Sequence, residues 1–217
     1  MQNKIQYRYL DYRDINSITR CINESYNNMK NKDYFVPPTE QYIVNILNSL
    51  GKSIGAFYNN TMVGVASFVY SNAAKTSLYE YQHLCRNKDS AIQFEHGVVS
   101  PPFQGNGILG DLLQIACSDF SKLGYQYIIS SVHPLNYSSL KTAFKIKQKA
   151  TNIVRIYDNN IRYILVGNLQ NNASDNFIDI KHLLIYSYQE IEKLMELGYC
   201  AFDIDSHNHI IKLGWLI

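Results

Sequence analysis

The sequence is poor in cysteine and has no long apolar run. Its four cysteines, Cys21, Cys85, Cys117 and Cys200, are far apart and form no CxxC pair. Such spacing argues against a cysteine-type zinc site and against a disulfide framework, and it fits a reduced compartment. No apolar stretch approaches the roughly 20 residues that span a bilayer, and the polar N-terminal segment has no signal-peptide core. We therefore expect a cytoplasmic protein.

The chain also lacks an excess of charge of either sign. Twenty Lys and Arg residues stand against 18 Asp and Glu, and the formal net charge of +2 is too small to predict binding to nucleic acid or to an anionic membrane. Hydrophobic residues make up 46% of the chain and charged residues 18%, which predicts a sizeable core. We expect a small-molecule partner, neither nucleic acid nor membrane, and we leave open a homodimer.

Alternation and helical periodicity predict a chain of the α+β class. Asp14 and Thr39 are placed to cap two helices that follow a strand at 4–10. After them the pattern predicts a hairpin turning at Asn59-Asn60, a strand at 91–99, a helix at about 108–123, a strand at 125–132, a helix after Asn136 and a hairpin turning at Asn159-Asn160.

Residues 170–176, QNNASDN, are typical of a linker and divide the chain into a domain at 1–170 and an appendage at 177–217. In the appendage, Ser187 and Glu190 are spaced as a capping box for one helix, and two strands follow it. A helix and two strands are too few to bury a good core alone. We expect this small C-terminal α/β appendage to pack on the domain.

Three glycines, Gly105, Gly107 and Gly110, lie between a predicted strand and a predicted helix in FQGNGILGDLL. Free N–H groups and the helix dipole at a helix start attract anions, and glycine lets a ligand approach the backbone. The spacing matches a dinucleotide-binding fingerprint, but SPPFQ separates the strand from Gly105 and no carboxylate ends the next strand. The alternatives are a different phosphate ligand and a purely structural turn.

The wider stretch VVSPPFQGNGILGDLL resembles motif A of the GNAT superfamily, the acyl-CoA-dependent N-acetyltransferases. Leu109 departs from it, because the family usually has Gly or Ala there. A second segment, VHPLNYSSLKTAF, resembles the family's helix start after its fifth strand, with Asn136 opening the helix and Ser139 three residues later. The resemblance covers roughly residues 4–169, and its details look like a bacterial small-molecule branch. The matching positions in motif A are Val99, Pro101, Phe103, Gln104, Gly105, Gly107, Ile108, Leu112 and Leu113.

The resemblance implies the GNAT fold, which is a mixed, mostly antiparallel twisted sheet flanked by helices, with one parallel pair of strands splayed apart. It implies acetyl-CoA (coenzyme A) as acyl donor and no metal. The backbone of Val98 and Val99 would pair with the pantetheine arm, and Gly97 is expected to mark a bulge there. The implied contacts to the rest of the cofactor are Gln104, Gly105, Asn106, Gly107, Ile108, Leu109, Gly110, Asn136 and Ser139.

Glu95 is the first candidate for the base that deprotonates the amine, and His96 is the second. Alternation places the two on opposite faces of the strand unless a bulge intervenes. The family's usual acid is a Tyr seven residues after the helix-opening Asn, a position that Ala143 holds here. Tyr137 is a possible substitute.

The implied activity is acetyl-CoA-dependent N-acetylation of a primary amine of a small molecule, by direct attack of the amine on the thioester. One alternative is a catalytically weak acyl-CoA-binding or regulatory module, which the missing tyrosine favours. Another is a protein or peptide N-acetyltransferase. The pair His207 and His209 lacks a third metal ligand nearby and is interpreted as a polar turn.

Overall fold

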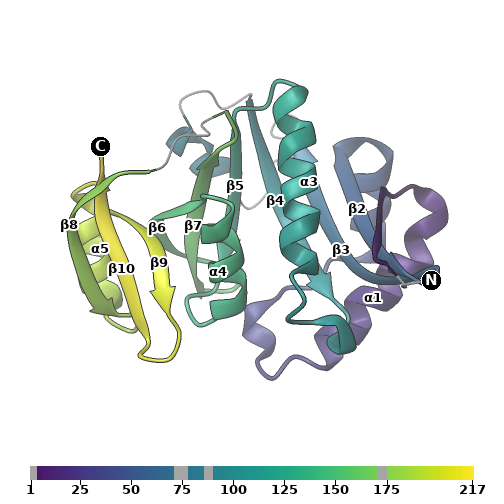
Figure 1. Cartoon of the computed structure of the whole chain (residues 1–217), viewed down its shortest axis with the longest axis horizontal. Coiled ribbons are helices and arrows are strands. Elements are labelled where there is room, and N and C mark those ends of the chain that lie inside the picture. Colours follow the sequence, from purple (N-terminus) through teal and green to yellow (C-terminus); the bar gives the residue numbers. More distant parts are fainter. Residues whose placement is uncertain (1–3, 71–77, 86–89, 171–174) are drawn as a thin grey trace.

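A computed structural model describes residues 4–70, 78–85, 90–170 and 175–217 of the chain. Ten strands form a single mixed sheet in the spatial order β1-β2-β3-β4-β5-β7-β6-β9-β10-β8 (Figure 1). The strands are β1 (Gln6–Tyr9), β2 (Gly51–Tyr58), β3 (Thr61–Tyr70), β4 (Ala91–Val99), β5 (Tyr127–Val132), β6 (Lys149–Ile156), β7 (Asn160–Asn168), β8 (Phe177–Leu184), β9 (Cys200–Asp205) and β10 (Ile210–Leu216).

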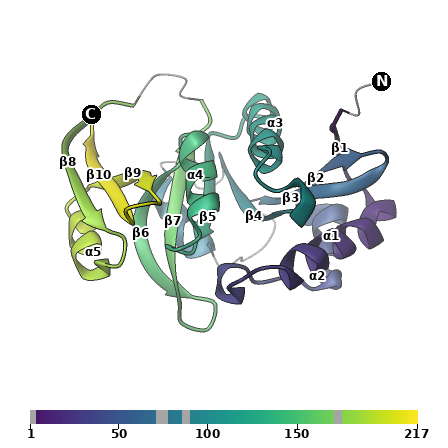
Figure 2. The ribbon, with the colours of Figure 1, turned by 60° about the horizontal axis from the view of Figure 1, so that its bottom comes forward.

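The helices lie against this sheet, and α1 and α2 are on the opposite side of it from α3 and α4 (Figure 2). None of the helices in the described ranges has both the length and the apolar character that crossing a membrane requires. The helices are α1 (Ile15–Asn27), α2 (Glu40–Asn45), α3 (Ile108–Lys122), α4 (Tyr137–Lys145) and α5 (Tyr188–Glu196), with short turns η1 (Tyr12–Asp14), η2 (Lys32–Tyr34), η3 (Ile46–Leu50), η4 (Tyr79–Leu84) and η6 (Pro101–Phe103). The predicted α+β class is confirmed.

Three local sequence signals for caps and turns can be compared with the structure. Thr39 caps α2 as predicted, because its side chain accepts a hydrogen bond from the backbone N–H of Tyr42. Asp14 is at the cap position of α1, but its carboxylate pairs with Arg8 at 2.6 Å instead of capping the helix. Ser187 also makes no side-chain cap at α5, so the predicted capping box is wrong.

Strands β4 and β5 are parallel neighbours along only a short stretch. Their ladder runs from Ala91 opposite Tyr127 to Gln93 opposite Ile129. Beyond these pairs β4 continues beside β3 alone, as far as Val99 opposite Gly64. The end of β4 therefore has one edge that no strand of the described chain covers.

The pairing of β4 with β3 contains a bulge at Glu95. Phe94 pairs with Phe68 and His96 pairs with Ser67, so Glu95 is an extra residue in β4. The expected bulge at Gly97 is wrong, because Gly97 pairs regularly with Ala66.

Two hydrophobic clusters fix the layers around β4. On one face α1 packs on the sheet through Ile18 and Ile22, which meet Val65 and Val98. On the other face α3 packs through a cluster that includes Leu112, Ala116, Phe120, Phe68 and Phe94. Because both faces of β4 are covered, the residues at its end lie inside the protein.

The C-terminal elements extend the sheet rather than standing apart from it. Strand β9 joins β6 where Ala201 pairs with Ala150, and β10 and β8 follow outward. Strand β8 was not predicted from the sequence, and residues 171–174 of the predicted linker lie outside the described residues. One cluster joins Leu140, Ala143, Ala150, Tyr163 and Leu165 to Ile185, Ile191, Met195, Ala201, Ile211 and Leu213 of the C-terminal segment.

Candidate active site

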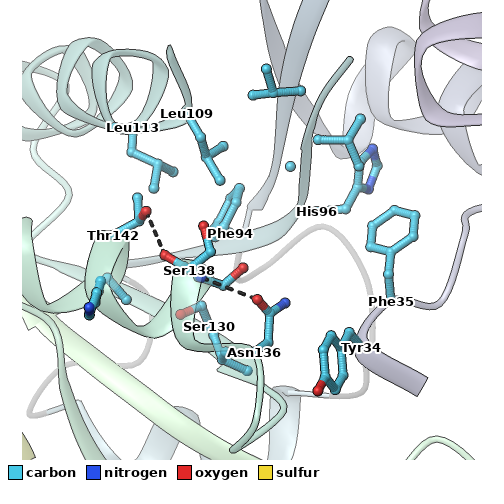
Figure 3. Close-up of a pocket in the computed structure, with 18 of the residues that line it drawn as sticks. Tyr34, Phe35, Phe94, His96, Leu109, Leu113, Ser130, Asn136, Ser138 and Thr142 are labelled. Atoms are coloured by element: carbon cyan, nitrogen blue, oxygen red, sulfur yellow. Dashed lines mark hydrogen bonds between the residues drawn. The ribbon is translucent and has the colours of Figure 1, made fainter. Parts of the chain in front are cut away.

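A cavity of about 500 Å³ lies where β4 and β5 separate. The start of α3 and the residues of α4 line one side of it, as Leu109, Leu113 and Thr142 show in Figure 3. Tyr34 and Phe35, from the connection between α1 and α2, line the other side. The cavity therefore runs from one face of the sheet to the other through the gap beside β4.

The glycine turn forms one wall of this cavity. Gly105 and Gly107 both have φ of 79°, a left-handed conformation that favours glycine, and a Cβ added at either would meet no atom within 4 Å. Gly107 is the N-cap of α3, and no side chain in the described ranges caps that helix. The first N–H groups of α3 are thus free for an anion, and the space above the two glycines lets it approach.

Side chains within the turn hold its shape. Gln104 Nε2 donates to the carbonyl oxygen of Val99 at 2.9 Å and so ties the turn to the end of β4. Asn106 Nδ2 donates to the carbonyl oxygen of Phe103 at 3.1 Å, and Asn106 is not among the residues that line the cavity. The side chains of these two predicted cofactor contacts therefore bond within the turn itself.

The uncovered edge of β4 presents the backbone of Gly97 and Val99. The N–H of Ser100 donates to the carbonyl of Val63 in β3 at 2.8 Å. Backbone groups alternate along a strand, so those of Val98 also point to β3, whereas those of Gly97 and Val99 point to the gap. Val98 lines the cavity, but its side chain packs in the α1 cluster.

Leu109, the departure from motif A, fits against Gly97. A Cβ added at Gly97 would lie 2.6 Å from Leu109 Cδ1 and 2.8 Å from Phe94 Cζ. The missing side chain at 97 therefore leaves the space that the larger residue at 109 fills. Both residues line the cavity.

The contact predicts that Gly97 and Leu109 are energetically coupled. Gly97→Ala is expected to lower the free energy of unfolding by about 1–3 kcal/mol, because its methyl group overlaps Leu109. Adding Leu109→Ala is expected to recover part of that loss. Urea denaturation of the two single variants and the double variant measures the coupling, and strictly additive losses would contradict the contact.

Helix α4 begins with the predicted pair Asn136 and Ser139. The Asn136 side chain accepts a hydrogen bond from the N–H of Ser139 at 3.2 Å, which caps the helix. Thr142 Oγ1 donates to the carbonyl of Ser138 at 2.9 Å (Figure 3). Asn136, Ser138, Ser139 and Thr142 all line the cavity. The spacing of Asn136 and Ser139 thus has a structural cause in the cap.

Glu95 is a partly buried carboxylate held by two donors. Gln93 Nε2 donates to Glu95 Oε2, and the hydroxyl of Tyr42 in α2 also bonds to this carboxyl group. Burial raises the pKa of Glu95, and the hydrogen bonds from Gln93 and Tyr42 lower it in part. A carboxylate whose pKa is raised toward neutrality is a better proton acceptor at physiological pH than an exposed one.

His96 lies on the same face of the sheet as Glu95 because of the bulge. The His96 ring packs edge to face with Phe35, with ring centroids 6.4 Å apart. Glu95 bonds to Tyr42 on that same side of the sheet. Burial lowers the pKa of His96 to about 4, so the imidazole is neutral at physiological pH. The two base candidates are therefore neighbours, contrary to simple alternation.

Tyr137, the candidate acid, is turned toward the C-terminal segment. Its hydroxyl lies 2.7 Å from His209 Nδ1, and Tyr137 is not among the residues that line the cavity. Ala143, at the family's usual tyrosine position, lines the cavity and belongs to the cluster shared with the C-terminal segment. In the same helix, Lys141 Nζ donates to Ser206 Oγ of the C-terminal segment at 2.6 Å.

The wall formed by α1 and by the connection to α2 was not predicted from the sequence. Ser25, Met29, Tyr34 and Phe35 line the cavity there. Arg162 Nη2 in β7 donates to the carbonyl of Asp33 at 2.6 Å and holds this connection against the sheet. The aromatic pair in DYF was the one available sequence signal, and nothing in the sequence relates it to residue 162.

Metal ligands do not gather at this cavity or elsewhere in the described ranges, where no group of three or more His, Cys, Asp or Glu residues is placed to hold an ion. His209, from the polar HNH stretch, bonds to Tyr137. All four cysteines are free thiols.

No family model matches the sequence, and no curated protein matches it either. The fold is similar to that of the ribosomal-protein-S18-alanine N-acetyltransferase from Escherichia coli, at a TM-score of 0.60 and 12% identity, over 81% of this chain and 100% of that one. It is also similar to a putative acetyltransferase from Salmonella typhimurium solved with acetyl-CoA, at 0.58 and 16%, over 80% and 98%.

A third similar structure is the polyamine N-acetyltransferase of Drosophila melanogaster, with a TM-score of 0.57 and 12% identity over 76% of this chain and 100% of that one. At identities this low the comparison establishes the fold alone. That fold is the GNAT fold. One of these similar enzymes is named for a ribosomal protein and another for polyamines, so the fold does not choose the acceptor. About a fifth of this chain lies outside each match.

Proposed function

We propose that this chain is an acetyl-CoA-dependent N-acetyltransferase that transfers an acetyl group to a primary amine of a small molecule. The observation that carries the proposal is the continuous cavity between the glycine turn and the face where Glu95 bonds to Tyr42. Such a path joins an anion site to a proton acceptor through the sheet. The Salmonella structure, solved with acetyl-CoA, has the same fold.

The residues present fit the donor. The free N–H groups at the start of α3, with Gly105 and Gly107 below open space, would hold its pyrophosphate. The uncovered backbone groups of Gly97 and Val99 would pair with its pantetheine amides, as an added strand pairs with a sheet edge. The donor supplies an acetyl group activated as a thioester.

The chain's own groups then accept one proton and stabilise one developing negative charge. The attacking amine must be neutral, and Glu95 is placed to take its proton, directly or through a water molecule. The N–H group of Gly97, the uncovered residue nearer to Glu95 along β4, is the donor available for the oxygen on which negative charge develops, and the Gly97 carbonyl and the backbone of Val99 remain for the pantetheine arm. Burial of the site strengthens both interactions, because the local dielectric constant is low.

The tyrosine that the resemblance expects as acid is missing from its usual position in α4, since Ala143 holds that position and Tyr137 bonds to His209, and the tyrosine that lines the described cavity, Tyr34, comes from the opposite wall. This observation favours a second candidate, a catalytically weak acyl-CoA-binding module. A thiolate leaving group is a weak enough base to depart without a general acid, so we keep the enzyme as the main proposal. Turnover distinguishes the two.

Acetyl-CoA is expected to stabilise the chain, and Gly107→Ala is expected to abolish that effect. At 100 times Kd a ligand adds about 2.7 kcal/mol, which raises Tm by roughly 5–10 °C for a chain of this size. A methyl group at 107 points into the open space where the pyrophosphate would lie and strains a left-handed residue. Differential scanning fluorimetry with and without acetyl-CoA measures the shift.

Gly124→Ala is the matched control. Gly124 also has a positive φ, of 93°, and open space around its Cβ, but it follows the far end of α3 and does not line the cavity. This variant is expected to lower Tm by a similar amount yet to keep the full shift with acetyl-CoA. A wild-type chain whose Tm does not respond to acetyl-CoA would overturn the proposed function.

A further inference from the structure

Two buried polar atoms at the cavity have no hydrogen-bond partner in the described chain. They are Ser25 Oγ in α1 and His96 Nε2 in β4. Ser25 is 1% exposed and His96 is 5% exposed. A buried donor or acceptor that stays unpaired destabilises the fold, so native proteins seldom leave two beside one cavity without a ligand or water to satisfy them.

Both residues line the cavity on the face opposite to α3. Met29 and Phe35 line it there as well, and Phe35 meets the edge of the His96 ring (Figure 3). Glu95 points to this same face through its bond to Tyr42. The unpaired serine and histidine thus belong to the part of the cavity where an amine would meet the base.

Charged groups are scarce in this part of the cavity. Of the described residues that line the whole cavity, Glu95 and Lys141 alone are charged, and Lys141 belongs to α4 on the other side. His96 is neutral because burial lowers its pKa to about 4. Arg162 lies behind the wall, where its two terminal nitrogens donate to the carbonyls of Ile161 and Asp33.

The available partners therefore select against a second charge on the acceptor. A carboxylate would find no cation on the α1 side of the described cavity, and a second ammonium would find no carboxylate besides Glu95. Desolvating an unpaired ion is far costlier than desolvating a hydroxyl or an amide. A hydroxyl or amide, in contrast, would satisfy two groups that are otherwise unpaired.

We propose that the acceptor carries, within a few bonds of its reacting amine, an uncharged hydrogen-bonding group that pairs with Ser25 and His96. The substrate class is amino alcohols and amino amides, rather than amino acids with a free carboxylate or diamines. This inference rests on the proposed function and narrows its acceptor.

Acetyl transfer to five small amines tests the acceptor class in the full-length chain. Ethanolamine and propylamine have nearly the same shape and differ by one hydroxyl, glycinamide and glycine differ by one charge, and ethylenediamine adds a second ammonium. Thiol release gives kcat/KM, expressed per free base so that differences in the protonated fraction of each amine do not enter. We expect ethanolamine to exceed propylamine by about 10-fold or more, and glycinamide to exceed glycine and ethylenediamine similarly.

Two variants link the preference to the named residues. Ser25→Ala and His96→Phe are each expected to reduce the ratio of ethanolamine to propylamine toward one, whatever they do to absolute rates. Thr19→Val is the matched control, because Thr19 Oγ1 is another unpaired buried hydroxyl of α1 that does not line the cavity. Thr19→Val is expected to keep the wild-type ratio of ethanolamine to propylamine, since the Thr19 hydroxyl does not contact the acceptor.

The possible outcomes distinguish a failure of this inference from a failure of the proposed function on which it rests. Turnover without a preference for ethanolamine, or with glycine or ethylenediamine preferred, overturns the inference and leaves the acetyltransferase intact. A wild-type ratio that persists in both Ser25→Ala and His96→Phe also overturns it. Transfer to none of the five amines overturns the enzyme proposal together with the inference.

Discussion

A chain that ends at residue 176 is expected to unfold or to aggregate at 25 °C. The shared cluster contains Leu140, Ala150, Tyr163 and Leu165, all 0% exposed, and its other half comes from residues beyond 176. Fully burying one large apolar side chain contributes about 1.5–3 kcal/mol, so uncovering several at once removes an amount comparable to the roughly 5–15 kcal/mol that holds a typical protein folded.

The cut would also turn β6 into an edge strand, because β9 is its outer neighbour in the sheet. An uncovered edge pairs readily with other chains. Size-exclusion chromatography and a thermal melt followed by circular dichroism report both effects. A shortened chain that stays monomeric and melts cooperatively within a few degrees of the full chain would contradict this prediction.

Two point variants within the C-terminal segment provide the control. Leu213 is 0% exposed in the shared cluster, whereas Leu197 is 64% exposed. Leu213→Ala is expected to lower the free energy of unfolding by about 2–5 kcal/mol, and Leu197→Ala is expected to change it little. Equal effects of the two variants would show that the segment does not stabilise the domain through this cluster.

The sequence alone predicted the glycine turn because its signals are local. Gly105 and Gly107 follow a strand and open a helix, and the left-handed φ that the structure gives them is a property of single residues. The motif therefore identified most of the wall on the α3 side of the cavity before any tertiary contact was known.

Strand β8 was not predicted because the alternation in FIDIKHLL is confined to the four residues 178–181 and stops at His182. Asp179 has φ of 49°, and two residues of β8 oppose one residue of β10 near Gly214. With this bulge both Ile178 and Ile180 are exposed, at 50% and 47%, so they do not form the buried face of a half-buried strand. The shift comes from pairing with β10, so it has no signature within FIDIKHLL itself.

The side of the cavity on which the acceptor is proposed to bind depends on contacts that a linear sequence does not show. The bulge that turns Glu95 and His96 to one face is a matter of register between β3 and β4. Arg162 reaches the carbonyl of Asp33 across 129 positions of the chain. The residue types were visible, but their grouping around Ser25 and Phe35 follows only from the packing of α1 on the sheet.

Glu95→Gln is expected to lower kcat by about 100-fold or more and to leave the chain at least as stable as the wild type. General base catalysis typically contributes 10²–10⁴-fold, which about sets the size of the loss. Glutamine keeps the shape of the side chain but cannot take a proton. Because the fold buries this carboxyl group and raises its pKa, replacing it with a neutral amide removes the cost of burying a charge.

The raised pKa of Glu95 sets the direction in which stability and activity change with pH. A carboxyl group whose pKa is raised by folding stabilises the native state at low pH, and that contribution is lost as pH rises through the raised pKa. Activity runs in the opposite direction, because the proton acceptor forms over the same pH range. The wild type is therefore expected to lose Tm and to gain kcat/KM there, and Glu95→Gln is expected to show neither change.

Tyr42→Phe separates a titrating base from a merely structural glutamate. The Tyr42 hydroxyl bonds to Glu95 and lowers the carboxyl pKa, so removing it is expected to move the acid limb of the kcat/KM profile to higher pH while keeping the activity at its plateau. Thermal melts and rate profiles of the three chains across pH 5–9 measure these shifts. A profile whose acid limb is the same in the wild type, Tyr42→Phe and Glu95→Gln would assign the limb to another group and remove Glu95 from the reaction.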